Sequence, residues 1–211
     1  MSIGTKSVLF GVHQFAIHPW FVALAWWKLY GFPFDPRLWV AFFVHDLGYI
    51  GKPNMDGPEG ETHPILGARI MGFLFDRGSA SDIAALEHLG RFPMESDCCF
   101  WRNFCLYHSR FYAKLNGRPF SRLCVADKLA ISLTPDWLYM IQARLTGELD
   151  EYMRGSGART PAGDRTPSQW RQDVKAYCRA WAFEHRDGRM DTWTGTIRDL
   201  AIQTAKAKEG K

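Results

Sequence analysis

The sequence lacks the long apolar runs that a membrane protein needs. Its most apolar stretch, residues 20–44, is interrupted by Lys28, Asp35, Arg37 and prolines. No run therefore reaches the roughly 18–20 apolar residues of a membrane-spanning helix. The N-terminus also has no charged segment followed by an apolar stretch and a small-residue cleavage site. We therefore expect a cytoplasmic protein without a membrane partner.

Paired cysteines and dense positive charge are also missing. The chain has 5 cysteines, an odd number without C-x-x-C spacing, which favours free thiols in a reducing compartment. The formal net charge is only +4, and there is no dense basic run. This charge mildly favours anionic ligands but does not predict stable nucleic-acid binding.

Aromatic residues, by contrast, are abundant. The 211 residues include 9 Trp, 15 Phe and 7 Tyr, while the hydrophobic (46%) and charged (23%) fractions are ordinary for a globular protein. A chain of this length forms one domain with a full core, or one domain with an appendage. Most of the aromatic residues should pack that core, and the rest are available for a pocket or for a homodimer interface.

The pattern of apolar residues is helical nearly throughout, and no β-alternation, internal repeat or G-x-G-x-x-G is present. The sequence therefore predicts an all-α bundle. We expect residues 1–153 to form the helical core, residues 154–168 to be a flexible linker or lid, and residues 169–211 to form helices packing on the core. Gly, Pro and N-cap signals place the helices near 12–30, 37–47, 63–76, 81–89, 96–115, 121–133, 135–153, 169–184 and 192–206.

Several histidines and one aspartate lie on helix faces that are otherwise apolar. His18, His45, His108 and Asp127 each have apolar neighbours three and four residues away, so they should point inward. A lone buried histidine is usually a hydrogen-bonded core residue. A buried carboxylate without a partner, however, is strongly disfavoured. Together these residues predict a divalent metal ion as their common partner.

The order His18, His45-Asp46, Asp127 resembles the H…HD…D signature of the HD-domain superfamily of metal-dependent phosphohydrolases. The local contexts HPWFVALAWWKLYG, FFVHDLGYIGKP and SRLCVADKLA are similar to its metal-binding helices, and the match spans about residues 12–135. The resemblance implies a helical bundle around a metal site. His13 is an alternative to His18, although the residues that follow His18 suit that register better.

The resemblance extends to a second metal ion, so that one or two ions are expected. THPILGARIM is similar to an HP-x-x-G-A element that supplies a further ligand, here His63. For the last ligand we prefer His108, in CLYHSRFY, over His88, in ALEHLGRF, because His108 has the stronger apolar context. The mixed imidazole and carboxylate set suits Mn, Fe, Co or Mg better than a structural zinc site, which usually uses thiolates, and we rank Zn and Ni below these metals. The full predicted set, with Asp46 bridging, is His18, His45, Asp46, His63, His108 and Asp127.

The implied activity is hydrolysis of a phosphoester by a metal-activated water, and the expected substrate is a nucleotide or (deoxy)nucleoside phosphate. Lys52 and Arg110 are the candidates for holding phosphate. Tyr49 stands where the superfamily's nucleoside-monophosphate phosphatases have a catalytic Glu, and the GYP element of its cyclic-di-GMP phosphodiesterases is missing. Neither substrate therefore carries over. A non-catalytic, metal-stabilised binding module and a di-iron oxygenase are the alternatives, in that order.

Overall fold

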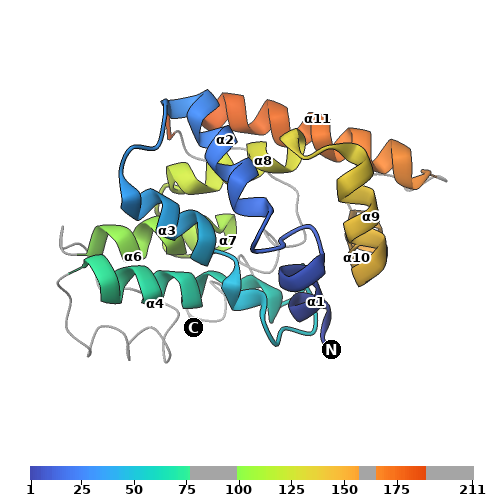
Figure 1. Ribbon diagram of the computed structural model, residues 1–211, viewed down its shortest axis with the longest axis horizontal. Coiled ribbons are helices and arrows are strands. Elements are labelled where there is room, and N and C mark those ends of the chain that lie inside the picture. The colour runs from blue at the N-terminus through green and yellow to red at the C-terminus, as the bar shows by residue number, and fades with distance from the viewer. Residues whose placement is uncertain (77–98, 157–164, 189–211) are drawn as a thin grey trace, which may run out of the picture.

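The computed structural model describes residues 1–76, 99–156 and 165–188, and these segments contain helices but no β-strand (Figure 1). The predicted all-α class is confirmed. None of the helices in these segments has both the length and the apolar character required to cross a bilayer. In chain order the elements are α1 (Ile3–Phe10), α2 (His18–Tyr30), α3 (Pro36–Val44), η1 (Leu47–Tyr49), η2 (Gly60–Thr62), α4 (Pro64–Phe75), α6 (Phe100–Leu106), α7 (Arg110–Leu115), α8 (Arg122–Leu133), α9 (Asp136–Thr146), α10 (Glu148–Ser156) and α11 (Pro167–His185).

Helix α8 lies at the centre of the main bundle (Figure 1). Helices α2 and α11 both pack against it, and α4 pairs with α6. Val22 of α2, Phe42 of α3, Met71 of α4, Leu129 of α8 and Trp181 of α11 belong to one continuous buried core. Because α8 is enclosed on several sides, a polar side chain on its inner face needs a polar or ionic partner.

Two smaller apolar clusters extend the bundle. Tyr139, Leu149 and Trp170 join α9, α10 and α11, while Val8 packs with Tyr49 and so joins α1 to η1. The second cluster fixes the segment that directly follows the His45-Asp46 pair. The N-terminal helix α1 therefore stabilises the neighbourhood of that pair, although no helix was predicted before residue 12.

The predicted helix over residues 12–30 was wrong at its start, because α2 begins only at His18. Pro19 explains the difference. Proline has no N–H to donate and clashes with the carbonyl four residues earlier, so it is tolerated only in the first turn of a helix. His18 consequently lies in the first turn of α2, where it is buried.

Two other predicted helices are interrupted. The helix over 96–115 breaks between α6 and α7, and the helix over 135–153 breaks at Gly147, whose φ of 85° is left-handed. α10 reaches Ser156 and α11 begins at Pro167, so both ends of the expected linker 154–168 are helical. The helices predicted over 81–89 and 192–206 fall outside the described residues.

Candidate metal centre

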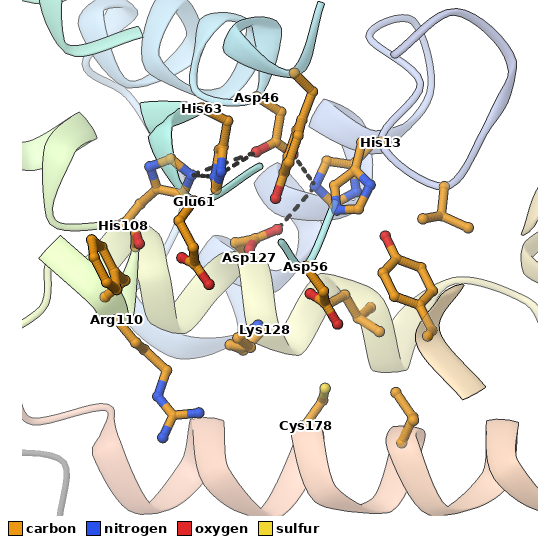
Figure 2. A pocket seen from close by; sticks show the side chains of 18 of the residues that line it. His13, Asp46, Asp56, Glu61, His63, His108, Arg110, Asp127, Lys128 and Cys178 are labelled. Carbon is orange, nitrogen blue, oxygen red and sulfur yellow. Dashed lines mark hydrogen bonds and ion pairs between the residues drawn. The ribbon is translucent and has the colours of Figure 1, made fainter. Parts of the chain in front are cut away.

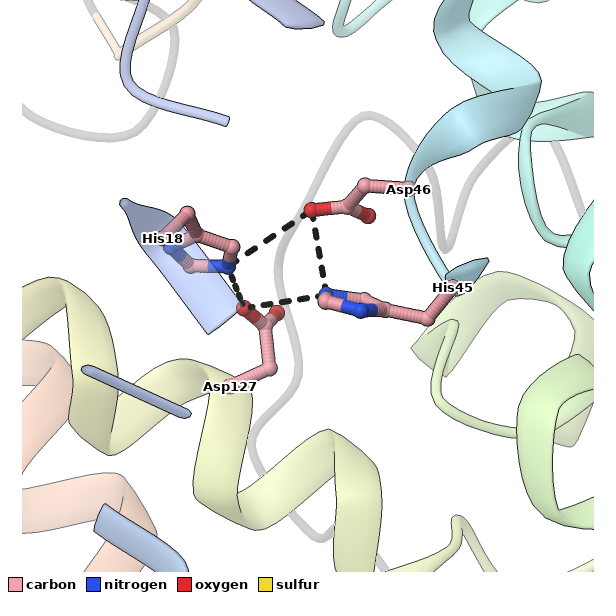
Figure 3. A group of neighbouring side chains, drawn as sticks. All are labelled: His18, His45, Asp46 and Asp127. Atoms are coloured by element: carbon pink, nitrogen blue, oxygen red, sulfur yellow. Dashed lines mark hydrogen bonds and ion pairs between the residues drawn. The ribbon is translucent and has the colours of Figure 1, made fainter. Parts of the chain in front are cut away.

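Four of the predicted ligands form one compact group at the centre of the bundle (Figure 3). His18 Nε2 lies 3.0 Å from Asp127 Oδ1 and 3.6 Å from Asp46 Oδ2. His45 Nε2 lies 3.1 Å from Asp46 Oδ2 and 3.8 Å from Asp127 Oδ1. One potential ligand atom from each of these residues lies within 4.8 Å of the others. The chain therefore brings together α2, the end of α3, and α8 at a single point.

A second group shares Asp46 with the first. His63 and His108 have their Nε2 atoms 3.1 Å apart, and these atoms lie 3.7 and 3.5 Å from Asp46 Oδ1. Asp46 thus turns Oδ2 toward His18 and His45, and Oδ1 toward the other two imidazoles. Asp46 is therefore the residue that the two groups of potential ligand atoms share. His88, the alternative to His108, lies outside the described residues.

Three of the histidines are oriented by the same local contact. The Nδ1 atom of His45, His63 and His108 is within hydrogen-bonding distance of the carbonyl oxygen three residues earlier in the chain. A carbonyl only accepts, so each Nδ1 carries the proton and donates it. In the neutral ring, Nε2 then presents a lone pair to the centre, as a metal ligand must. The accepting carbonyls belong to Phe42, Gly60 and Cys105.

The polar atoms of the two groups are incompletely satisfied by the protein itself. Within residues 1–76, 99–156 and 165–188, His45 Nε2 and Asp46 Oδ2 are buried and have no hydrogen-bond partner. The Nε2 lone pairs of His63 and His108 face each other across 3.1 Å, which is unfavourable without a cation or a proton between them. Unpaired buried polar groups are destabilising, and a divalent cation would accept all of these lone pairs. The donor set therefore fits a metal ion, and the cluster could hold one.

The electrostatics of the centre also favour positive charge. Burial lowers the pKa of His45, but the Asp46 and Asp127 carboxylates outweigh burial and raise it to about 10. Burial opposes ionisation of both aspartates, yet the surrounding imidazoles hold the pKa of Asp46 and of Asp127 well below its usual range. Burial and the neighbouring His108 hold the pKa of His63 well below its usual value. The two ionised carboxylates therefore attract positive charge, either a proton on His45 Nε2 or a metal ion in its place, while His63 offers a neutral imidazole.

Close backbone contacts bring the two groups together. At Gly48 a Cβ would lie 1.9 Å from the carbonyl oxygen of His63, and at Gly67 it would lie 2.8 Å from that of Val44. Only glycine permits such an approach of one backbone to another. Gly48 thus lets η1 pack against the backbone of His63, and Gly67 lets α4 pack against the backbone of Val44 and His45. Tyr49 then stacks on the ring of His63, with centroids 3.9 Å apart and an interplanar angle of 11°.

Both groups open onto a cavity of about 210 Å³ (Figure 2). Arg110 lines this cavity, whereas Lys52 does not and instead donates from Nζ to Thr62 Oγ1 at 2.5 Å. His13 also lines the cavity but belongs to neither ligand group, because its Nδ1 contacts Glu148. The geometry therefore places His18, not His13, among the potential metal ligands.

Sequence reasoning missed Glu148, which lies behind the cavity and is completely buried. Its carboxylate accepts hydrogen bonds from Ser7 Oγ and Thr146 Oγ1, both at 2.6 Å, and from the Val12 N–H at 3.1 Å. Ser7 and Val12 are 141 and 136 residues away in the chain, so no local pattern could reveal the contacts. Glu148 thereby fixes the segment that leads into α2 and His18.

Comparisons with known proteins provide no relative from which roles could be transferred. A scan against protein-family models and searches of curated proteins and of solved structures all found no match. The assignment of this centre therefore rests on its side-chain geometry, and the HD-domain resemblance stays a prediction.

Proposed function

We propose that the chain is a metal-dependent phosphohydrolase of the HD-domain type, which hydrolyses a phosphoester of a nucleotide or (deoxy)nucleoside phosphate. The observation that carries this proposal is the position of Asp46, whose two oxygens face separate groups of ligand atoms. Paired metal ions held in this way are typical of enzymes that act on phosphate esters. Mn, Fe, Co or Mg suits the imidazole and carboxylate donors, and no cysteine belongs to either group among the described residues.

When bound, such metal ions lower the pKa of a water molecule and neutralise charge on phosphoryl oxygens. The chain's own contribution is to hold the donor atoms in place. The Nδ1 contacts to backbone carbonyls fix the rings of His45, His63 and His108 before any metal binds. Burial keeps bulk water away from these side chains, so that charges within the site interact strongly.

Arg110 is suited to contact the substrate's phosphate. Its Nη1 donates to Tyr177 Oη at 2.8 Å, and its guanidinium lies 5.2 Å from the centroid of the Trp181 ring. These contacts fix the side chain beside the cavity, so little conformational entropy is lost when an anion binds. Asp46 and Arg110 are therefore the residues for which we propose direct roles in the reaction.

The rest of the cavity wall suits the organic part of a nucleotide. Aromatic and aliphatic side chains from α9 and α11 line it, among them Tyr139, Trp170 and Val174. Such a wall can cover a planar base by apolar contact and stacking. The combination of metal ligands, a basic side chain and an apolar wall favours a nucleotide over inorganic phosphate compounds.

Phosphate release from a panel of nucleoside mono-, di- and triphosphates tests the proposal. Protein loaded with Mn²⁺ should release phosphate from at least one member, and a chelator should stop the reaction. Asp127→Ala, purified in parallel, should lose activity by at least about 100-fold, because losing even a residue that only hydrogen-bonds to a metal ligand costs about 10- to 100-fold. Full metal content without phosphate release from any phosphoester would contradict the proposal.

A di-iron oxygenase is the second candidate function, because the ligand set for two ions is complete. Oxygen consumption by iron-loaded protein, and loss of turnover under anaerobic conditions, would favour it over hydrolysis. A metal-stabilised binding module would instead show bound metal and no turnover of either kind.

A further inference from the structure

One wall of the cavity is basic. Arg110 and Lys114 of α7 and Lys128 of α8 all line it. Figure 2 shows Arg110 and Lys128 toward the helix that carries Cys178, whereas Asp46 and His63 lie on the other side of Asp127. Arg110 and Lys128 thus line a different part of the cavity from Asp46 and His63. We name Arg110, Lys114 and Lys128 the basic wall.

Lys128 is the member of the basic wall without a fixed partner. In the described segments its ammonium group takes part in no hydrogen bond or ion pair, although the side chain is partly buried. By contrast, Lys175 on α11 pairs with Asp136 at 3.1 Å. A partly buried ammonium group without a protein partner is ready to bind an anion that enters the cavity. Its position directly after Asp127 in α8 keeps it close to the metal ligands.

A charge count indicates what kind of anion would bind. The cavity is lined by four carboxylates (Asp46, Asp56, Glu61, Asp127) and three cations (Arg110, Lys114, Lys128), so these side chains have a net charge of −1. Two divalent ions at the two ligand groups would change this to +3. One phosphate dianion bound at the metal ions would leave positive charge on the basic wall. A second phosphate group on the same molecule would neutralise it.

We propose that the basic wall is an anion subsite for a second phosphate group of the substrate. The inference rests on the proposed phosphohydrolase function and narrows its substrate class. The preferred substrates are organic phosphates with at least two phosphate groups, such as nucleoside diphosphates or bisphosphates. Monophosphates have no second phosphate group to bind Lys128 and are therefore bound more weakly.

Binding of non-hydrolysable nucleotide analogues tests the subsite without depending on turnover. Metal-loaded protein is titrated calorimetrically with α,β-methylene-ADP and with the phosphonate analogue of AMP, and metal content is verified afterwards. Wild type should bind the diphosphate analogue at least about tenfold more tightly, as expected for one additional charge-assisted contact. Lys128→Gln should lose that preference while binding the monophosphate analogue within about twofold of wild type.

Matched variants separate the subsite from general effects of charge. Lys175→Gln removes the same charge from α11 at a residue that does not line the cavity, and it should retain the wild-type preference. Lys128→Arg keeps the charge and should retain most of the preference, which controls for damage to folding in Lys128→Gln. An undiminished preference in Lys128→Gln, equal affinity of wild type for both analogues, or no binding of either analogue would overturn the subsite.

The same variants distinguish failure of the subsite from failure of the proposed function. If wild type prefers the diphosphate analogue through Lys128 but hydrolyses no phosphoester, the subsite is supported and the phosphohydrolase proposal fails. If wild type hydrolyses nucleotides and Lys128→Gln treats mono- and diphosphates as wild type does, the phosphohydrolase proposal is supported and the subsite fails.

Discussion

Asp46→Ala should leave the protein without bound metal and without hydrolytic activity. Asp46 is the residue that both ligand groups share, with Oδ2 3.1 Å from His45 Nε2 and Oδ1 3.5 Å from His108 Nε2. Loss of an outer-shell contact alone reduces metal affinity by about 10- to 100-fold, so loss of a shared ligand should exceed that at both positions. Elemental analysis of the purified variant, together with phosphate release, measures the effect.

Asp56→Ala is the matched control for Asp46→Ala. Asp56 lines the same cavity but belongs to neither ligand group, so removing its carboxylate should leave the metal content unchanged. Replacing Asp46 by alanine also removes a carboxylate that raises the pKa of His45, so that pKa should fall in the variant. If Asp46→Ala kept the full metal content of wild type, the metal centre would lie elsewhere in the chain.

Glu148→Gln should lower the free energy of unfolding by about 3 kcal/mol at neutral pH. The Glu148 carboxylate accepts hydrogen bonds from Ser7, Val12 and Thr146, and an amide can satisfy only some of these donors. Chemical denaturation of both proteins measures the difference. Glu59→Gln, at an exposed position, is the control and should cost less than about 1 kcal/mol.

The effect of Glu148→Gln should depend on pH. Burial raises the pKa of Glu148, but the side chains of His13, Ser7 and Thr146 outweigh burial and lower it below its ordinary value of 4.5. A lowered pKa in the folded state means that ionised Glu148 stabilises the protein above about pH 4.5. This contribution is lost as the pH falls through the lowered pKa. The difference between the two proteins should therefore shrink in acid, and a constant difference down to pH 2 would contradict an ionised Glu148.

The helices that carry the predicted metal ligands were the most predictable part of the chain, because the sequence patterns that indicate them are local. Ser121 caps α8 as its sequence position predicts, and the apolar residues around Asp127 reveal the inward face of that helix. The apolar run before His45 likewise reveals the end of a core helix. The resemblance that these segments carry identified residues that the structure brings together.

Contacts between distant segments were not predictable in the same way. The break between α6 and α7, which turns the Nδ1 of His108 toward a backbone carbonyl, has no glycine or proline to mark it. The role of Glu148 depends on Ser7 and Val12, and the partner of Lys52 is Thr62 rather than a group in the cavity. These features follow from how helices pack, which local patterns of apolar residues do not encode.

The number of metal ions bound per chain tests the proposed two-metal centre. Protein purified without chelator, wild type and His63→Ala in parallel, should be analysed for transition metals per chain. Because His63 belongs only to the group formed with Asp46 and His108, wild type should contain about two ions and His63→Ala about one. A single ion in wild type that is unaffected by His63→Ala would contradict the two-metal centre, and a protein without metal would contradict the metal centre altogether.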